Sequence, residues 1–257
     1  MTDLNPQRVL VTAGAAGIGR AIAQAFAAAG ARVHVCDLDA AALQTLRADT
    51  PGISTSVCDI GDRAAIGTMV AEAVQALGGL DVLVNNAGIA GPTASVEQFD
   101  PDAWDAVLRV NLTGTFNVTR ACIPHLKRAT DGSILVMSSL AGRFGYPNRR
   151  AYSTTKWGLV GFTKTLPREL GDFGIRVTAI LPGAVEGPRL EQVLAGRAQA
   201  SGRSVEQERA AALGNQSIKR FVPPQEIAAL ALFLASSAGR SISGQILPID
   251  GDSQSAS

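Results

Sequence analysis

The sequence predicts an α/β fold in which helices cover both faces of a parallel sheet, a doubly wound arrangement. Short β-branched runs alternate along the chain with longer Ala- and Leu-rich stretches that have helical periodicity. The strand-like runs are almost continuously apolar, as expected when helices cover both sides of each strand. Successive strand–helix units imply right-handed crossovers between parallel strands.

Seven runs have the composition of buried strands, and six longer stretches have that of helices. The strands are predicted at residues 9–11, 33–36, 53–57, 82–84, 134–137, 177–181 and 246–249. The helices are predicted at residues 17–29, 40–48, 62–77, 102–128, 152–170 and 225–235. No composition break or long linker divides the chain, so we expect a single domain over residues 1–257.

Two segments lie outside this alternation. Residues 187–222 are polar and rich in Ala and Arg, and we expect them to form a helical lid over the carboxyl end of the sheet. The tail from Asp252 to Ser257 is short and polar, and we expect it to be frayed.

The composition excludes several classes of protein. Because 23 Lys and Arg residues balance 22 Asp and Glu residues, no overall field favours nucleic acid or an anionic membrane. Cys36, Cys58 and Cys122 each stand among apolar neighbours, so we expect small buried side chains rather than disulfides or a metal site. The segment Met1 to Gln7 is polar, and no stretch approaches the roughly 20 apolar residues of a membrane span. We therefore expect a soluble cytoplasmic protein.

A turn of small residues follows the first strand and leads directly into a helix. It reads Thr12-Ala13-Gly14-Ala15-Ala16-Gly17-Ile18-Gly19. Gly17 and Gly19 have no Cβ, so the backbone can approach a pyrophosphate closely, and the helix N-terminus favours its negative charge. A glycine-rich turn alone is weak evidence, but its place after the first strand favours a dinucleotide site.

Asp37 stands at the end of the second predicted strand, about 20 residues past these glycines. An acid at this place can hydrogen-bond the ribose hydroxyls of an adenosine. Its charge would repel a 2′-phosphate, and neither Ala16 nor Leu38 offers a cation to hold one, so NAD(H) is predicted over NADP(H). Asp37 could instead cap the helix near Ala40, although Asp39 is better placed to do so.

Polar residues also end the third and fourth predicted strands. Asp59 follows the third, near the expected adenine, and Asn85-Asn86-Ala87-Gly88 follows the fourth. Open α/β sheets bind ligands at the carboxyl ends of their strands, so these residues are candidates for cofactor contacts. Asn, Asp and Gly also favour turns for conformational reasons alone, and both interpretations stay open.

Tyr152 and Lys156 lie four residues apart on a predicted helix and therefore share one face. A phenol has an ordinary pKa of about 10, and a nearby ammonium lowers that pKa because it favours the phenolate. The pair could then accept the proton of an alcohol while a hydride leaves the same carbon. Ser139, at the preceding strand end, could hydrogen-bond the reacting oxygen. Alone such a pair is usually a helix-face contact, but after a dinucleotide-type turn it predicts hydride transfer.

These motifs resemble those of the short-chain dehydrogenase/reductase family over essentially the whole chain. The matching features are Thr12…Gly17-Ile18-Gly19, Asn85-Asn86-Ala87-Gly88, Val110-Asn111-Leu112, Ser139, Tyr152…Lys156 and Pro182-Gly183. The resemblance implies a Rossmann-like sheet of seven strands in the order 3-2-1-4-5-6-7, and a homotetramer or homodimer. With the Asp37 argument, it implies an NAD-dependent dehydrogenase or reductase that interconverts a secondary alcohol and a ketone.

The resemblance also implies roles for individual residues. Tyr152 would be the general acid/base, Lys156 would bind the nicotinamide ribose and lower the tyrosine pKa, and Ser139 would orient the substrate. Asn111 would hold a water that links Lys156 to solvent. The residues expected to contact NAD are Thr12, Gly14, Gly17, Ile18, Gly19, Asp37, Leu38, Asp59, Ile60, Asn86, Ala87, Gly88, Tyr152, Lys156, Pro182, Gly183 and Val185. No metal is expected.

The chain departs from the family pattern at two positions near the cofactor. Ala13 stands where the first turn glycine would be, and we expect the turn to survive with an altered entry. Gly187 stands where a threonine often contacts the nicotinamide amide, so backbone groups would have to replace that contact.

The substrate is the least determined part of the prediction. A small polyol, a sugar-like alcohol or a hydroxy acid would suit the site. Arg149, Arg150, Arg189 and Arg197 could clamp a carboxylate, phosphate or sulfonate, or could equally form a solvated lid face with intersubunit ion pairs. Two other functions stay open. One is the reduction of 3-oxoacyl thioesters, which usually uses NADPH. The other is a non-catalytic scaffold that senses NAD, but the presence of Asn111, Ser139, Tyr152 and Lys156 argues against it.

Overall fold

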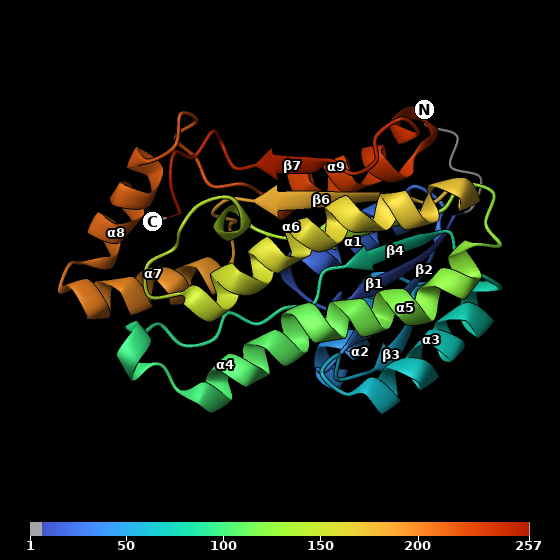
Figure 1. The fold of residues 1–257 in the computed structure, drawn as a ribbon, viewed down its shortest axis with the longest axis horizontal. Helices are drawn as coiled ribbons and strands as arrows, with labels where there is room; N and C mark the ends of the chain where they lie inside the picture. The colour runs from blue at the N-terminus through green and yellow to red at the C-terminus, as the bar shows by residue number, and fades with distance from the viewer. Residues whose placement is uncertain (1–6, 257) are drawn as a thin grey trace.

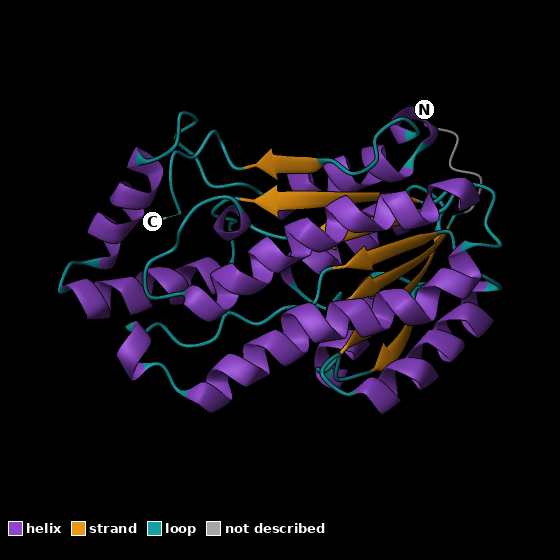
Figure 2. Ribbon diagram, in the orientation of Figure 1, coloured by secondary structure: helices purple, strands orange, loops and turns teal. Residues whose placement is uncertain are grey.

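The computed structural model describes residues 7–256. Residues 1–6 and Ser257 lie outside that range. The described chain contains one sheet of seven parallel strands in the order β3-β2-β1-β4-β5-β6-β7. All strands point the same way and helices lie on both sides of the sheet (Figure 2). The predicted fold class and strand order are confirmed.

The strands and helices begin and end close to the predicted limits. The strands are β1 (Arg8–Thr12), β2 (Arg32–Asp37), β3 (Ser54–Val57), β4 (Val82–Asn85), β5 (Ser133–Met137), β6 (Arg176–Pro182) and β7 (Ile246–Ile249). The α-helices are α1 (Gly17–Ala28), α2 (Ala40–Asp49), α3 (Arg63–Leu77), α4 (Pro101–Leu108), α5 (Thr115–Leu126), α6 (Arg150–Leu170), α7 (Pro188–Ser201), α8 (Val205–Gly214) and α9 (Pro224–Ala235).

Two apolar layers hold the helices against the sheet. On one face α3, α5 and α6 pack through side chains that include Val118 and Leu159. On the other face α1, α2 and α9 pack through side chains that include Ile22 and Leu46. The first layer lies in front in Figure 1. The inner strands β1, β4, β5 and β6 are almost entirely buried between the layers, which explains their largely apolar sequences.

The three cysteines behave as small apolar side chains. Cys36, Cys58 and Cys122 are free and buried, as predicted. Burial raises the pKa of the Cys58 thiol to about 11, and nearby acidic groups add to the effect. In the described part of the chain, no helix is both long enough and apolar enough to cross a membrane.

The helix predicted over residues 102–128 changes its winding in the middle. A π-helical segment, η2 (Arg109–Gly114), joins α4 to α5. The prediction of one continuous α-helix is therefore wrong in this segment, although the chain stays helical. Asn111 lies within it and is completely buried, and its main-chain carbonyl accepts a hydrogen bond from the Thr115 hydroxyl at 2.8 Å. Single π turns inside α-helices occur frequently at functional sites.

The segment over residues 187–222 forms two helices, α7 and α8, beyond the carboxyl ends of the strands (Figure 1). The helices enclose a small apolar core of their own, which contains Leu194 and Phe221. Val185 and Val222 pair at the two ends of the segment and close it into a loop on the sheet edge. The predicted helical excursion is confirmed, and its action as a substrate lid stays a prediction.

The C-terminal stretch packs against this lid. Ser253 and Ala256 are buried, and the Ser253 hydroxyl donates to the Asp250 carbonyl at 2.7 Å. The backbone N–H of Gln254 donates to the carbonyl of Asn215, just past the end of α8, at 2.9 Å. The prediction of a frayed tail is wrong for the described residues 252–256, because these backbone contacts fix them.

Candidate active site

The turn between β1 and α1 is tied to the loop that follows β4. The Thr12 hydroxyl accepts hydrogen bonds from the backbone N–H groups of Asn86 and Ala87, each at 3.0 Å. The Asn86 side-chain amide donates to the carbonyls of Thr12 and Ala13, at 3.1 and 2.9 Å. Thr12 is buried, so it positions both loops, and Asn86 braces the glycine turn in addition to any contact with a cofactor.

The glycines of this turn are needed for two different reasons. Gly17 has φ +52°, a left-handed conformation that glycine adopts at low cost. A Cβ on Gly19 would lie 2.3 Å from the Ala13 carbonyl oxygen and 2.5 Å from Asn86 Nδ2, closer than atoms can pack. Ala16, the residue before α1, makes no side-chain cap, and the first turn of α1 holds no acid. The N–H groups at the start of α1 therefore suit a bound anion.

Ala13 also adopts a left-handed conformation, with φ +49°. A residue with a Cβ is less stable there by about 1–2 kcal/mol, because its Cβ crowds the following carbonyl. The turn thus forms with alanine in place of the family's glycine, in the conformation that glycine would adopt at lower cost.

Asp37 faces the glycine turn from the end of β2. Its carboxylate accepts hydrogen bonds from the N–H groups of Ala15 at 3.0 Å and Asp39 at 3.2 Å. Asp39, not Asp37, caps α2, so the alternative that Asp37 serves as that cap is wrong. A carboxylate offers about four acceptor sites, so Asp37 retains capacity for ribose hydroxyls. Leu38 beside it is 68% exposed, and no described cation forms an ion pair with Asp37.

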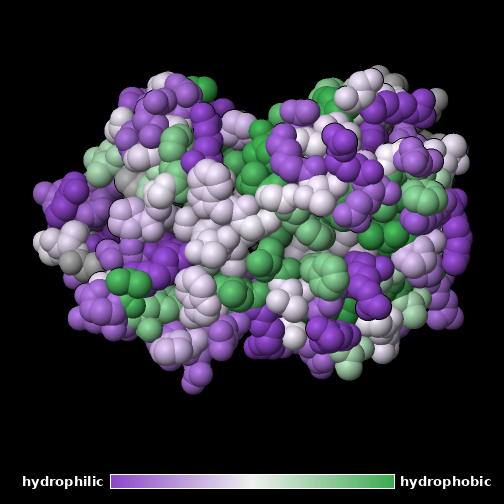
Figure 3. Space-filling view, in the orientation of Figure 1, coloured by the Kyte–Doolittle hydropathy of each residue, from purple (hydrophilic) through white to green (hydrophobic). Residues whose placement is uncertain are grey.

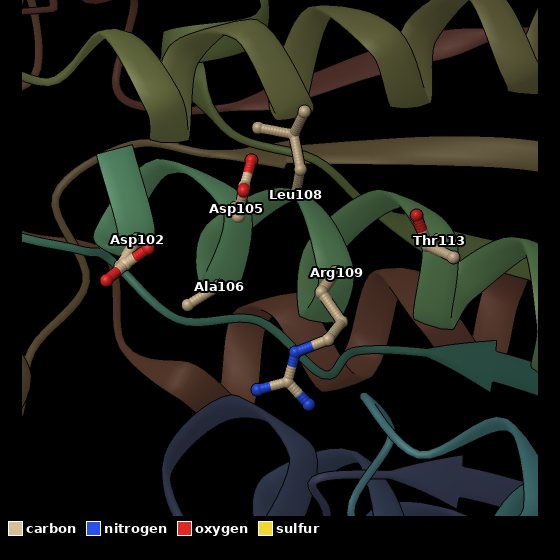
Figure 4. Close-up of a pocket in the computed structure, with 6 residues that line it drawn as sticks. All are labelled: Asp102, Asp105, Ala106, Leu108, Arg109 and Thr113. Carbon is tan, nitrogen blue, oxygen red and sulfur yellow. The ribbon is translucent and has the colours of Figure 1, made fainter. Parts of the chain in front are cut away.

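The end of β3 meets the π-helical segment. Asp59 accepts a hydrogen bond from the Gly61 N–H at 2.7 Å, and a carboxylate oxygen lies 3.6 Å from Arg109 Nη1. Arg109 projects to the opposite side of its helix from Asp105 and Leu108 (Figure 4). The groove that these residues line, about 440 Å³, contains none of the predicted site residues. Sequence reasoning did not identify the Arg109 contact, because no local pattern pairs residues 50 positions apart.

Ile60 is buried beside this ion pair, and a Cβ on Gly114 would come within 2.6 Å of its Cγ2. Gly183, just past the end of β6, packs closely on the end of β7. Its N–H donates to the Ile249 carbonyl at 3.0 Å, and a Cβ there would lie 2.8 Å from the Asp250 Cα. Pro182, Gly183 and Val185 therefore line the sheet edge where the β6 loop turns into the lid.

Gly187 begins α7 with φ +132°, a conformation that only glycine readily adopts. The position held by a threonine in many family members thus serves here to turn the backbone into the lid helix.

Tyr152 and Lys156 lie in the first turns of α6, as predicted. Lys156 is buried, and its Nζ lies 5.4 Å from the centroid of the Tyr152 ring. The ammonium donates to the Met137 carbonyl at 2.8 Å, and the Ser138 hydroxyl donates to the Lys156 carbonyl at 2.8 Å. The end of β5 and α6 are therefore held together through both the side chain and the backbone of Lys156. Sequence reasoning missed this supporting role of Ser138.

The pKa of Tyr152 lies below its ordinary value of 10.0. Removal of the phenol from water raises the pKa, but the positive charges of Lys156, Arg189 and Arg149 and a hydrogen bond with Ser139 outweigh that effect. Burial also lowers the pKa of Lys156, which the tyrosine opposes. The structure thus brings Ser139, Tyr152 and Lys156 together and favours the phenolate.

Asn111 joins the π-helical segment to the same site. Its amide oxygen accepts from the Ile89 N–H at 2.8 Å, and its Nδ2 donates to the Ile89 carbonyl at 2.9 Å and to the Thr155 hydroxyl at 3.1 Å. A Cβ on Gly88 would lie 3.3 Å from Asn111 Oδ1 and 3.5 Å from Lys156 Nζ. Asn111 therefore fixes the β4 loop beside the lysine, and the predicted water link stays a prediction.

Comparisons with known proteins decide the family. Residues 13–251 match the family model described as enoyl-(acyl carrier protein) reductase. The chain belongs to the short-chain dehydrogenase/reductase family. It is 38% identical to the 3-oxoacyl-[acyl-carrier-protein] reductase FabG of Thermotoga maritima, over 94% of this chain and 95% of that protein. It is 39% identical to a D-beta-hydroxybutyrate dehydrogenase of Cupriavidus necator, over 96% and 98%. A 2-keto-3-deoxy-L-fuconate dehydrogenase of Xanthomonas campestris is 38% identical, over 97% and 81%.

Solved structures of other family members have the same fold. An NAD+-bound xylitol dehydrogenase superposes with a TM-score of 0.92 at 29% identity, over 97% of this chain and 99% of that one. A variant of actinorhodin polyketide ketoreductase with NADPH superposes with a TM-score of 0.90 at 32% identity, over 98% of each chain. This short-chain dehydrogenase/reductase is therefore an oxidoreductase, an alcohol dehydrogenase or ketone reductase that uses a nicotinamide cofactor.

Proposed function

We propose that this enzyme is an NAD(H)-dependent oxidoreductase that interconverts a secondary alcohol and a ketone, with Tyr152 as general acid/base. The observation that carries the proposal is a phenol placed beside three cations, which lower its pKa. A tyrosine with a lowered pKa accepts the proton of an alcohol more readily than an ordinary phenol does.

The residues at the carboxyl ends of β1 to β4 fit an NAD molecule. The start of α1 would bind the pyrophosphate, Asp37 would accept hydrogen bonds from the adenosine ribose, and Asp59 and Ile60 would flank the adenine. Lys156 would donate to the nicotinamide ribose. When bound, the nicotinamide ring supplies or accepts the hydride. Asp37 without a neighbouring cation supports NAD over NADP.

The chain's own residues move the proton. In the oxidation direction the Tyr152 phenolate accepts the hydroxyl proton of the alcohol, and Lys156 stabilises the phenolate before that transfer. The Ser139 hydroxyl donates a hydrogen bond to the substrate oxygen as negative charge develops on it. In the reduction direction Tyr152 returns the proton to the same oxygen. Asn111 would hold the water through which Lys156 exchanges protons with solvent.

We propose a small polyol, a sugar-like alcohol or a hydroxy acid as the substrate. Relatives named as dehydrogenases of hydroxybutyrate and 2-keto-3-deoxy-L-fuconate, and a structural neighbour named as xylitol dehydrogenase, support this range. Reduction of 3-oxoacyl thioesters is the second candidate, supported by the FabG relative. The Asp37 and Leu38 pair disfavours it, because that activity is usually linked to NADPH.

We also propose a homotetramer or homodimer that acts in the cytoplasm. Apolar residues gather over α5 and α6 in the middle of the face shown in Figure 3. Phe116 on α5 and Trp157 on α6 are each 49% exposed, and an apolar patch over these helices would suit an association surface. Light scattering would measure the assembly.

The enzymatic proposal is tested by mixing the protein with NAD and a panel of secondary alcohols and following the absorbance of the reduced nicotinamide. Tyr152→Phe should retain NAD binding and lose turnover by several orders of magnitude, because the phenylalanine ring has no proton to exchange. Thr154→Ala, an exposed position on the same helix, is the matched control and should retain activity. Near-normal turnover in Tyr152→Phe would remove Tyr152 from its proposed role.

A further inference from the structure

A pocket of about 260 Å³ lies between the start of the catalytic helix and the lid. The loop after β4 contributes Thr93 to its wall, the segment before α6 contributes Tyr146 and Arg149, and α7 contributes Val193 and Arg197. Its walls therefore come from the β4 loop, the segment before α6 and the two helices α7 and α8, of which α8 contributes the Glu208 carboxylate. Tyr152 lies close by, since the guanidinium carbon of Arg149 is 5.7 Å from the centroid of its ring.

Arg149 is the most unusual residue of the pocket. It is only 9% exposed, yet a single hydrogen bond, from Nη1 to the Thr93 hydroxyl at 3.1 Å, holds its guanidinium. Its Nε is buried without a hydrogen-bond partner, and no carboxylate of the described residues lies within ion-pair distance of it. A buried charge without a counter-ion is costly, often by several kcal/mol. The Arg149 guanidinium therefore has N–H donors that could bind an anion.

The backbone holds Arg149 in this place. The Arg149 N–H donates to the Tyr146 carbonyl at 3.2 Å, and between them stand Pro147 and Asn148, the latter with φ +60°. Proline followed by a residue at positive φ, closed by that hydrogen bond, is the pattern of a type II turn. The guanidinium is therefore presented by a fixed turn rather than by a mobile loop.

Two further arginines surround the same tyrosines. The guanidinium carbon of Arg149 lies 5.7 Å from the ring centroids of both Tyr146 and Tyr152. That of Arg189 lies 5.8 Å from the Tyr152 ring, and Arg197 donates to the Tyr146 hydroxyl. Among the residues that the structure describes, no acid forms an ion pair with Arg189 or Arg197.

Arg150, next in the chain, shows how a structural arginine differs. Its Nη1 donates to the Ser95 carbonyl at 3.0 Å and its Nη2 to the Ala94 carbonyl at 2.9 Å. It also lies over the Phe99 ring, at 5.3 Å from the centroid. Both of its terminal nitrogens donate to backbone carbonyls, so Arg150 ties the β4 loop to α6.

We propose that a carboxylate of the substrate binds at Arg149, on the wall of this pocket that lies next to Tyr152, with Arg189, which contacts the same Tyr152 ring, as the second ligand. A carboxylate can accept from Nε and an Nη of one guanidinium at the same time, which would satisfy the buried Nε of Arg149 and neutralise its charge. Because Arg149 lies beside the Tyr152 ring, only a few bonds would separate that carboxylate from the carbinol carbon. The inference rests on the proposed function and narrows its substrate to a small hydroxy acid and the matching oxo acid.

The test compares a carboxylate with its uncharged amide. Isothermal titration measures the affinity of butanoate and of butanamide for the full chain saturated with NADH, at constant ionic strength. The wild-type protein should prefer butanoate by about tenfold or more, since a hydrogen bond to a charged group contributes roughly 1.5–3 kcal/mol. Arg149→Gln should abolish the preference, Arg189→Gln should reduce it, and the matched control Arg150→Gln should retain it.

Equal affinity of the wild-type protein for the two ligands, or a preference that survives in Arg149→Gln, would overturn the proposal. Because Arg149 is buried, the thermal unfolding of Arg149→Gln without ligand must be measured to show that this variant folds. Arg189 is exposed, so Arg189→Gln tests the carboxylate site independently of the fold. Binding does not require turnover. A butanoate preference without oxidation of any alcohol refutes the proposed function alone, and oxidation of neutral alcohols without the preference refutes the carboxylate site alone.

Discussion

Replacing Asp37 is expected to change the cofactor preference of the enzyme. Its carboxylate stands at the end of β2, where the adenosine ribose would lie, and accepts from the N–H groups of Ala15 and Asp39. These bonds use two of about four acceptor sites. The remaining sites can accept from ribose hydroxyls, and the negative charge opposes a 2′-phosphate at the same place.

The magnitude follows from these contacts. A hydrogen bond to a charged group contributes about 1.5–3 kcal/mol, so Asp37→Ser should lower kcat/KM for NAD by roughly 10- to 150-fold. Adding Leu38→Arg places a cation at a position that is 68% exposed and next to the ribose. Because an arginine pairs well with a phosphate, the double variant should raise kcat/KM for NADP by a similar factor.

The assay is the initial rate with each cofactor on one secondary alcohol. Asp37→Ser also removes the acceptor for the Ala15 N–H, so thermal unfolding must accompany the kinetics to separate lost stability from lost recognition. Asp39→Ser is the matched control, because serine also caps a helix well and the ratio of NAD to NADP activity should stay unchanged. An unaltered ratio of NAD to NADP activity in Asp37→Ser would refute the reasoning, since a group other than Asp37 would then bind the adenosine ribose.

Three further predictions concern the glycine turn and the tyrosine. Gly19→Ala should lower the free energy of unfolding by about 1–3 kcal/mol and weaken NAD binding, because its Cβ would overlap the Ala13 carbonyl oxygen and the Asn86 side-chain amide. Denaturant unfolding and NADH titration measure both, and an unchanged stability would contradict the geometry. Ala13→Gly should instead stabilise the protein by roughly 0.5–1 kcal/mol in the same assay, since φ +49° suits glycine, and a loss of stability would argue against strain there. Arg189→Gln removes a charge that lowers the pKa of Tyr152, so the pH at which alcohol oxidation rises should move upward; an unmoved profile would show that Arg189 does not act on the tyrosine.

Most strands could be predicted from the sequence because they are short apolar runs with turn-forming residues at their ends, although β3 is largely Ser and Thr. The pairing of Tyr152 and Lys156 was predictable for a similar reason, since residues four apart on a helix face the same way. The structure then places Ser139, which follows the end of β5, beside them, as the order of motifs implied. These features depend on local pattern or on motif order, which the sequence records directly.

Other features depend on contacts between distant residues. The π turn around Asn111 has no signature in the sequence, because its amide is held by Ile89 and Thr155 from two other elements. The sequence of the C-terminal tail predicts a frayed end, but in the structure the Gln254 N–H donates to the Asn215 carbonyl and holds the tail in place. In the same way, Arg149 and Arg150 are neighbours of the same type, and only the fold shows that one lacks the partners that the other has.

The arginines around Tyr152 connect substrate binding to the pH dependence of the reaction. In the free enzyme Arg189 and Arg149 help to lower the pKa of the phenol. A carboxylate bound between them would cancel part of their positive charge, so the tyrosine pKa should rise in the substrate complex. The pH profile of kcat/KM reports the free enzyme, and that of kcat reports the complex.

For a hydroxy acid, the acidic limb of kcat should therefore lie at higher pH than that of kcat/KM when product release is not limiting. For a neutral secondary alcohol the two limbs should coincide, because the guanidinium charges stay uncompensated. In Arg149→Gln the separation seen with the acid should shrink. Coincident limbs for a hydroxy acid with the wild-type enzyme would mean that its carboxylate does not lie near Tyr152, and that these arginines serve the phenolate alone.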